Sequence, residues 1–410
     1  MKSTQRFSII TKASAASLIA IFSPEAMAGE TTSSGDCCPL NLLTGSGVSL
    51  GGWLYPEVNF QSAFGTSSAE EGALAVGHHD PDRNGFTIQN VEFSLSAKFG
   101  SNVTAFAAYA AKVDLDDRWA DEFEEYYATF HSLPLESQLK AGRFYPRFGY
   151  QQTLHPHDFT FIDQYLANGR MLGDDSLTLY GGEFSLPVLR RLPAGWEDRL
   201  SVAFGAVPDK NEEGEEEEET PFSAEGALFQ DWAAVADYTL SYAPKSNTRY
   251  EIGASGAWGR NNAERQTQLY GLHAEYFWRP DGVLNFNPHA NPGQYLRWRT
   301  ELFLRQHGTA NETGTRRDFT DFGAYTEITY GLPSGKVQTH LRGEYISGTA
   351  ETGQSERWRI SPAITWHPTE ALPVRFKIQY NYDHSAAFGD EHSVWAQFSL
   401  TWGDCCALAH

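Results

Sequence analysis

The sequence has little cysteine, little methionine and no long apolar run. Its 410 residues include 4 cysteines and 3 methionines, and hydrophobic residues make up only 41%. Beyond the N-terminus no stretch approaches the ~20 consecutive apolar residues that a membrane-spanning helix needs, so a helical membrane protein is excluded. Lysine and arginine number 31 against 52 acidic residues, which gives a net charge of −21. This charge disfavours nucleic acid as a partner, because phosphate binding needs a basic surface.

The N-terminus has the pattern of a secretory signal peptide. Lys2, Arg6 and Lys12 precede an apolar stretch, and a small-x-small triplet ends at Ala28. We therefore expect residues 1–28 to be removed on export. The alternative is that this segment is an amphipathic helix of the mature protein.

Strict alternation of apolar and polar residues is the main structural signal in the rest of the chain. Residues 374–383 place Val, Phe, Ile, Tyr and Tyr on one face and Arg, Lys, Gln, Asn and Asp on the other. The same pattern recurs in 91–99, 296–305, 337–345 and 357–366. Successive side chains of a strand point to opposite faces, and runs of ~10 residues or more are long enough for a tilted strand to cross a bilayer. The pattern therefore predicts an all-β, transmembrane antiparallel β-barrel with lipid outside and water inside.

Sixteen such runs can be counted, and the connections between them alternate between short and long. Long outer loops and short periplasmic turns are typical of outer-membrane barrels, and sixteen strands leave an aqueous channel. The domain plan is a signal peptide over 1–28, a periplasmic segment over 29–46, the barrel over 47–402 and a periplasmic tail over 403–410. The predicted strands lie near residues 47–62, 86–99, 102–114, 121–131, 137–148, 176–187, 198–208, 231–243, 248–260, 265–279, 294–306, 320–331, 335–347, 356–367, 373–384 and 391–402.

Several short motifs between residues 78 and 185 carry a resemblance to a known group. The motifs are His78-His79-Asp80-Pro81, Gly85-Phe86-Thr87-Ile88-Gln89, Gly142-Arg143-Phe144, Phe148-Gly149 and His155-Pro156-His157. This block resembles proteobacterial outer-membrane proteins related to phosphate-selective porins, which are often labelled zinc-regulated outer-membrane receptors. Energised receptors carry a large N-terminal plug domain, and the segment 29–46 is too short to hold one. The resemblance therefore implies a passive or weakly selective channel.

The predicted third outer loop, residues 149–175, is the candidate for a pore constriction. In sixteen-stranded porins this loop commonly folds inward, and here it is acidic, whereas phosphate selectivity would need lysines in the constriction. An acidic loop facing a basic wall would create a transverse field that sorts ions. The alternative is that the arginines pair with acidic neighbours on the strands and only keep the lumen wet. The residues expected on the loop side are Asp158, Asp163 and Asp175, and those on the wall are Arg342, Arg357, Arg359 and Arg375.

Histidines beside aspartates suggest a metal site in two outer loops. His78, His79 and Asp80 lie in the predicted first loop, and His155 and His157 lie in the third. Imidazole and carboxylate ligands suit zinc or copper. The alternative is that these are solvated loop residues, and no other cofactor is expected.

The cysteines form two adjacent pairs, Cys37-Cys38 before the first strand and Cys405-Cys406 after the last. First and last strands are neighbours in a closed barrel, so the pairs are expected to meet at the periplasmic rim. Disulfides between the pairs are the favoured interpretation, and a four-thiolate metal site is the alternative.

The sequence lacks the common catalytic motifs, including G-x-S-x-G, H-E-x-x-H and the glycine-rich phosphate loop, so an enzyme is not expected. We predict an outer-membrane channel for passive diffusion of small hydrophilic solutes or ions, with a cation preference that follows from the negative charge. The alternatives are a metal-capturing uptake protein and a barrel that sheathes a periplasmic redox partner at the cysteine-bearing rim. The expected surroundings are outer-membrane lipid and lipopolysaccharide, and a homotrimer is compatible with this class of barrel.

Overall fold

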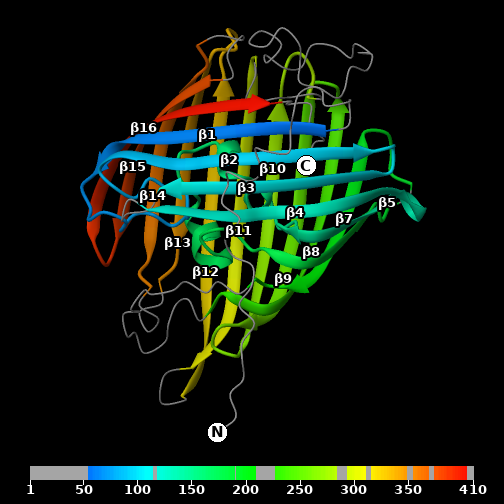
Figure 1. Ribbon diagram of the computed structural model, residues 1–410, viewed down its shortest axis with the longest axis horizontal. Helices are drawn as coiled ribbons and strands as arrows, with labels where there is room; N and C mark the ends of the chain where they lie inside the picture. Colours follow the sequence, from blue (N-terminus) through cyan, green and yellow to red (C-terminus); the bar gives the residue numbers. More distant parts are fainter. Residues whose placement is uncertain are drawn as a thin grey trace, which may run out of the picture.

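Sixteen antiparallel strands form one closed barrel in the computed structural model (Figure 1). The structure describes residues 54–113, 118–189, 191–208, 227–283, 293–310, 315–348, 354–368 and 374–403. The predicted fold class is confirmed. The strands are β1 (Leu54–Ser67), β2 (Gly85–Phe99), β3 (Val103–Val113), β4 (Trp119–Leu133), β5 (Ser137–Phe144), β6 (Leu179–Leu186), β7 (Trp196–Ala206), β8 (Phe229–Lys245), β9 (Thr248–Asn261), β10 (Gln266–Trp278), β11 (Tyr295–Ala310), β12 (Arg316–Gly331), β13 (Val337–Ile346), β14 (Arg357–Trp366), β15 (Val374–Ser385) and β16 (Gly389–Gly403).

The first and last strands close the sheet. β1 pairs antiparallel with β16, with Phe60 opposite Leu400, and the other pairs join strands that are consecutive in the chain. Closure leaves no strand edge whose peptide groups would face lipid without a hydrogen-bond partner. The signal peptide, the segment 29–46 and all four cysteines lie outside the described residues, so those predictions are not tested by the structure.

The alternation in the sequence becomes two different barrel surfaces. On β15 the apolar residues point outward, and Ile378 exposes 61% of its surface. The intervening Arg375, Lys377 and Gln379 point inward and are buried. An apolar exterior around a polar interior is the arrangement that a lipid bilayer requires of a barrel. Among the described residues, no helix is long and apolar enough to cross a membrane.

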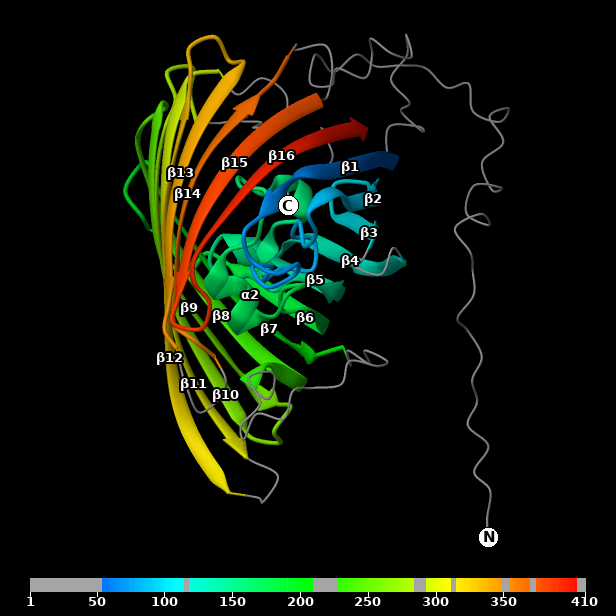
Figure 2. The same ribbon diagram turned by 90° about the vertical axis from the view of Figure 1, so that its left-hand side faces the viewer.

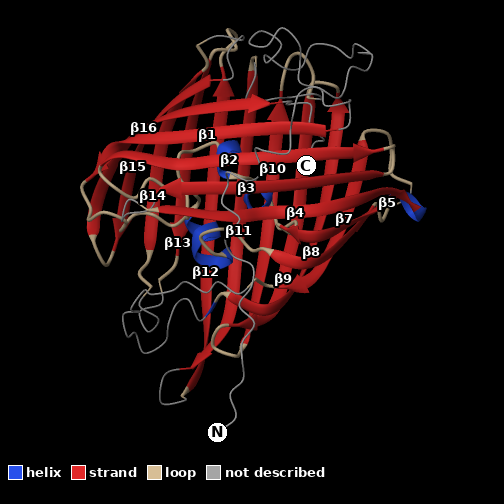
Figure 3. Cartoon of the chain, viewed as in Figure 1, coloured by secondary structure: helices blue, strands red, loops and turns tan. Residues whose placement is uncertain are grey.

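Two strands in the middle of the barrel wall are shorter than the sequence predicted. β5 ends at Phe144 rather than near residue 148, and β6 begins only at Leu179. The chain turns inward after Phe144, where carboxylates of neighbouring strands accept hydrogen bonds from the next backbone N–H groups. The N–H of Tyr145 donates to Glu125, and the N–H of Arg147 donates to Glu183. The connection between β5 and β6 lies within the ring of strands, with its helix α2 (Leu166–Leu172) visible inside (Figures 2 and 3).

Register shifts interrupt the ladders between β1 and β2, β3 and β4, β4 and β5, and β8 and β9, and the first two of these affect the lumen side of the site. The register between β1 and β2 slips by one residue at Gln89, and the register between β3 and β4 slips by one residue at Glu124. A bulge re-aims side chains, so that neighbours in sequence can point to the same face. Both Glu124 and Glu125 are buried on the lumen side as a result. We call the end of the barrel where β5 passes to β6 the loop end, and the end where β2 passes to β3 the turn end.

Candidate functional site

The connection between β5 and β6, residues 145–178 and called loop 3 below, crosses the lumen and carries the candidate site. It contains the short 3-10 helices η4 (Gln151–Thr153) and η5 (Pro156–Asp158) as well as α2. Peptide groups placed inside a barrel need partners there, because burial without a hydrogen bond is costly. The strands supply these partners with charged side chains.

Carboxylates of the barrel wall accept hydrogen bonds from loop 3 backbone N–H groups. These acceptors come from strands on several sides of the lumen, so they fix the loop along much of its path. The donors and acceptors are Tyr145 with Glu125 at 2.7 Å, Arg147 with Glu183 at 2.9 Å, Tyr150 with Glu301 at 2.8 Å, and Leu166 with Glu344 at 2.8 Å.

Cations of β15 donate to backbone carbonyls of the same loop. Lys377 Nζ donates to the carbonyl oxygens of Phe159 at 3.0 Å and Phe161 at 3.2 Å. Arg375 donates to the carbonyl oxygen of His157 at 2.6 Å. These two side chains therefore act as supports for the loop backbone.

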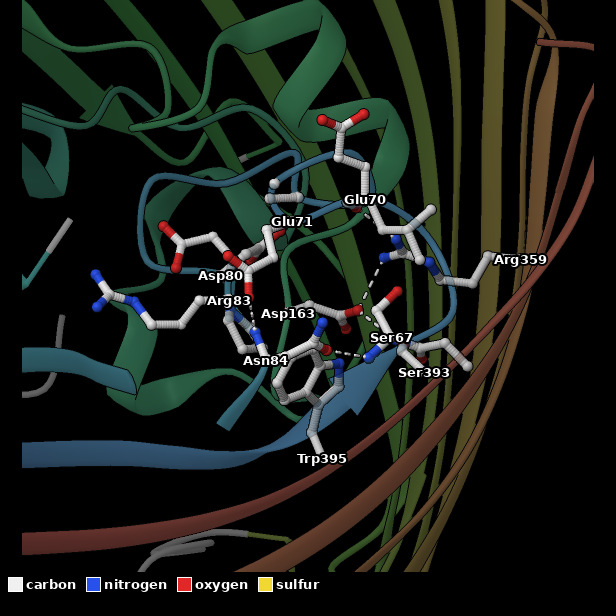
Figure 4. Close-up of a pocket in the computed structure, with 16 residues that line it drawn as sticks. Ser67, Glu70, Glu71, Asp80, Arg83, Asn84, Asp163, Arg359, Ser393 and Trp395 are labelled. Carbon is white, nitrogen blue, oxygen red and sulfur yellow. Dashed lines mark hydrogen bonds and ion pairs between the residues drawn. The ribbon is translucent and has the colours of Figure 1, made fainter. Parts of the chain in front are cut away.

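Asp163 is the most heavily bonded side chain of loop 3. Its carboxylate accepts from Arg342 at 2.6 Å and from Arg359 at 2.9 Å. It also accepts from the amides of Gln379 at 2.7 Å and Asn381 at 2.8 Å. Burial opposes the charge on Asp163, but the two guanidinium groups outweigh it and hold the pKa of this carboxyl below its usual range. Figure 4 shows Asp163 and Arg359 in contact among the residues that line a cavity of about 20 Å³, which has room for one water.

Three of the predicted wall arginines, Arg342, Arg357 and Arg359, also contact carboxylates of the strands. Arg357 donates to Asp383 at 2.9 Å and Arg359 donates to the same oxygen at 2.8 Å. Arg342 also lies 2.9 Å from Glu344. The strand ion pairs that the sequence left as an alternative are therefore present, and together with Asp163 they link three of the four arginines in one network.

The other two predicted loop carboxylates lie away from these arginine pairs. The Asp158 carboxylate is partly buried and lies 3.5 Å from His157 Nε2. Asp175 lies 3.6 Å from His78 Nδ1 in the last part of the loop. Asp163 is therefore the predicted loop acid that forms salt bridges with Arg342 and Arg359 of the basic wall.

Loop 1, residues 68–84 between β1 and β2, brings the first histidine cluster to loop 3. Asp80 has a structural role, because it accepts from the N–H groups of Val76 and Gly77 at 2.9 Å and from Gln164 of loop 3 at 2.7 Å. Burial lowers the pKa of His78 to about 4 although Asp175 opposes this. For His79 burial opposes protonation, but Glu124 and the carbonyl of Gln89 raise the pKa to about 8.

The second histidine cluster lies on the inner side of β2 and β4. His155 is almost completely buried, with Nδ1 2.8 Å from Glu124 and Nε2 2.9 Å from Glu125. His157 Nδ1 lies 2.8 Å from Glu92. Burial opposes protonation at both rings, but the carboxylates outweigh it: the pKa of His155 is raised well above its ordinary value, and that of His157 to about 9.

Sequence reasoning missed the strand glutamates of this cluster, Glu92, Glu124 and Glu125. One signal was present: adjacent glutamates within an alternating strand break the period of two, which indicates a bulge. Nothing local, however, relates Glu92 to His155, which lie 63 positions apart in the sequence, because that contact depends on the path of loop 3.

Two cavities flank loop 3 on the side of β4 to β7. The cavity at the loop end measures about 670 Å³ and is lined by His78, Glu122, Arg143 and Asp175 among others. A smaller one toward the turn end, about 80 Å³, is lined by polar residues that include Lys140 and Glu183. On the wall opposite, β13 to β15 hold the middle of loop 3 through Arg342, Arg359 and Lys377, whereas β4 and β6 hold its first residues.

Comparison with known proteins supports the fold alone. No protein-family model matches the chain, and no curated protein matches it. Solved structures match along most of its length. The anion-selective porin from Comamonas acidovorans is 10% identical, with a TM-score of 0.50 over 85% of this chain and 98% of that one. The outer-membrane channel DcaP of Acinetobacter baumannii is 11% identical, with a TM-score of 0.51 over 85% and 96%. OmpF of Salmonella typhi, in complex with daunomycin, is 9% identical, with a TM-score of 0.51 over 85% and 97%.

The fold and the inward loop together define the class: a sixteen-stranded barrel with the architecture of bacterial outer-membrane porins. The first two of these neighbours are a porin and a channel rather than enzymes.

Proposed function

We propose that this chain is an outer-membrane channel through which small hydrophilic solutes or ions diffuse passively. The observation that carries the proposal is loop 3, which is held across the lumen of a closed barrel by hydrogen bonds to strand side chains. Such a loop narrows a wide barrel without filling it, which is how a large pore acquires a size limit. An apolar exterior and a polar interior support the same role.

The passage is proposed to run between loop 3 and strands β4 to β7. Both flanking cavities border these strands, one toward each end of the barrel. The opposite side of the loop is closed by direct contacts, such as those of Lys377 and Arg375 with loop carbonyls. Solutes would therefore pass beside the anchors of Tyr145 on β4 and Arg147 on β6 rather than along the arginines of β13 to β15.

A preference for cations is part of the proposal. The arginines of the docked wall are engaged by Asp163, Asp383 and Glu344, so their charge is compensated before a solute arrives. The lining of the loop-end cavity includes Asp121 and Asp175, the salt bridge of Glu122 with Arg143 at 3.1 Å, and His78, whose lowered pKa of about 4 leaves it neutral, so the lining keeps a negative charge. Local charge at the narrow part of a pore decides selectivity.

Planar-bilayer recording tests the proposal. The refolded mature protein is expected to give discrete conductance steps and, under a KCl gradient, a reversal potential of the sign for cation preference. Glu122→Gln should reduce that potential, whereas Asp390→Asn, at an exposed rim position 2.6 Å from His384, should leave it unchanged. A correctly folded barrel that gives no conductance would contradict the channel, and a reversal potential of the opposite sign would contradict the cation preference.

A further inference from the structure

The buried cluster at the start of loop 3 has a donor set that the proposed channel does not use. We propose that it binds one divalent transition-metal cation of the Zn²⁺ type, and that this cation fastens loop 3 to β2 and β4. The proposed ligand atoms are His155 Nδ1, Glu92 Oε1 and a carboxylate oxygen of Glu124. His79 Nε2 lies outside this close group, 3.5 Å from a Glu124 oxygen, and is proposed as the fourth ligand that moves in when the cation binds. The inference rests on the proposed channel only for the route by which the cation enters.

The distances among three of these residues are close to those of a coordination shell. Glu92, Glu124 and His155 each offer one ligand atom, and the three atoms lie within 4.8 Å of one another. His155 Nδ1 is 2.8 Å from a Glu124 oxygen and 3.7 Å from Glu92 Oε1. Ligands ~2.0–2.1 Å from a tetrahedral zinc ion stand about 3.3 Å apart, so both spacings can reach that value with small side-chain adjustments.

Two buried acceptor atoms without a hydrogen-bond partner, one in the cluster and one beside it, supply independent support. Glu92 is fully buried, and its Oε1 has no hydrogen-bond partner. His79 Nδ1 lies 2.7 Å from the carbonyl oxygen of Gln89, which places a proton on Nδ1. The other nitrogen, Nε2, is buried without a hydrogen bond and lies 3.5 Å from Glu124. A buried nitrogen lone pair that faces a carboxylate is unfavourable unless a proton or a metal cation lies between them.

The surroundings of His155 match those of a metal-bound imidazole. With Nδ1 directed at the proposed cation, Nε2 donates to Glu125 at 2.9 Å, which fixes the ring and makes it a better ligand. The bulge in β4 makes this possible, because it turns the adjacent Glu124 and Glu125 toward the same ring. On β3, the small residues Ala108 and Ala110 stand opposite Glu125 and Glu92 and leave room between the two carboxylates.

A second acidic group marks a route from the lumen to this site. His78, Asp174 and Asp175 form another set that could hold a cation, and they are only partly buried. His78 and Asp175 line the large loop-end cavity. Asp174 and Asp175 also line a small cavity of about 20 Å³ whose other walls include His79 and Glu124. The outer group therefore lies between the loop-end cavity and the buried site, and we place the entry route of the cation here.

The donor chemistry selects the kind of cation. Two imidazole nitrogens and two carboxylate oxygens suit Zn²⁺, Cu²⁺ or Ni²⁺, whereas Ca²⁺ and Mg²⁺ prefer shells of oxygen alone. The competing arrangement is a cluster of protonated imidazoles that bridges the carboxylates with no metal. Metal and proton compete for the same lone pairs, so the two arrangements differ in whether zinc binds and in how many protons its binding releases.

Titration calorimetry with ZnCl₂ tests the site on the full mature chain. The protein is purified without a histidine tag, its cysteines are alkylated, and it is refolded in detergent and freed of metal before the titration. We expect one Zn²⁺ per chain, proton release on binding, and no comparable binding of Ca²⁺. Glu92→Gln and His155→Gln should each weaken zinc binding at least tenfold. Glu183→Gln is the matched control, because Glu183 is an equally buried glutamate that also holds the loop 3 backbone but lies outside the cluster.

Loss of folding is controlled by heat-modifiable mobility on gels and by a third variant, His79→Gln, which alters loop 1 and no strand. Replacement of Zn²⁺ by Co²⁺ should give the intense visible absorption of a tetrahedral site in wild type and a changed spectrum in His79→Gln. Absence of stoichiometric zinc binding in folded wild type, or an equal loss in Glu183→Gln, would overturn the site. Conductance is recorded on the same preparations. A barrel that binds zinc but does not conduct would support the metal site and refute the channel. A barrel that conducts but does not bind zinc would support the channel and refute the metal site.

Discussion

Replacement of Asp163 by asparagine is predicted to release loop 3 from the barrel wall. The carboxylate accepts four hydrogen bonds, two of them from Arg342 and Arg359, at distances between 2.6 and 2.9 Å. Asparagine keeps the shape, but it removes the charge and turns one acceptor atom into a donor that faces other donors. Removing one member of a buried ion pair typically costs ~3–5 kcal/mol, because the remaining charges stay buried without compensation.

This cost falls on the docking of the loop rather than on the barrel. The hydrogen-bond ladders between strands do not involve Asp163, so the barrel itself should stay folded. The loop also keeps other anchors, such as the bond of Leu166 N–H with Glu344 and those of Lys377 with two carbonyls. A loss of ~3–5 kcal/mol raises the population of a locally undocked loop by roughly 10² to 10⁴. Single channels of Asp163→Asn should therefore show a larger and noisier conductance. Their reversal potential should shift toward anions, because two arginines are uncovered.

Asp318→Asn is the control for this experiment. Asp318 lies at the loop end with 82% of its side chain exposed and pairs with Arg265 at 3.1 Å. Exposed pairs of this kind contribute only ~0–1 kcal/mol, so its conductance and selectivity should match wild type. Limited proteolysis of folded protein in detergent gives a second readout, since an undocked loop 3 is cut faster. If Asp163→Asn matches Asp318→Asn in conductance, selectivity and cleavage rate, the loop is not held by this network.

Two further predictions address the same docking surface. Lys377→Met leaves two loop carbonyls without their charged donor. This variant should destabilise the docking of loop 3 by ~1–3 kcal/mol per lost hydrogen bond and increase channel noise. Unchanged noise together with an unchanged rate of cleavage in loop 3 would contradict a role for these carbonyl contacts. In acid, the Asp163 network should be lost. The pKa of the Asp163 carboxyl is lower in the folded protein than the unfolded value of ~3.9. The contribution of this carboxylate to the docking of loop 3 is therefore complete above that value and disappears as the pH falls through the lower folded pKa. Conductance recorded from pH 6 downward should stay constant to about pH 4 and rise only below it, with Asp163→Asn lacking this step; a rise near neutral pH in wild type would point to another group.

Much of the barrel could be predicted because its signal is local. Each strand crosses from one end of the barrel to the other, and the alternation of apolar and polar residues indicates which side chains face lipid. The alternating run 374–383 therefore predicts β15 (Val374–Ser385) to within two residues at its C-terminal end. The boundaries of β5 and β6 were wrong for a tertiary reason. Carboxylates on β4 and β6 draw the backbone inward after Phe144, and the single-strand pattern contains no sign of this.

The site shows the same division. The sequence by itself identified Asp163, Arg342 and Arg359 as charged residues of a loop and a wall, because residue type and strand face are local properties. Only the tertiary structure decided that they touch, since the contacts join positions 179 and 196 residues apart and depend on where the loop descends. His155 and Glu92 likewise meet because closure of the barrel and the inward course of loop 3 bring β2 and β4 around one ring. Hydrophobic alternation fixes the face of a side chain, whereas its partner is set by long-range chain geometry.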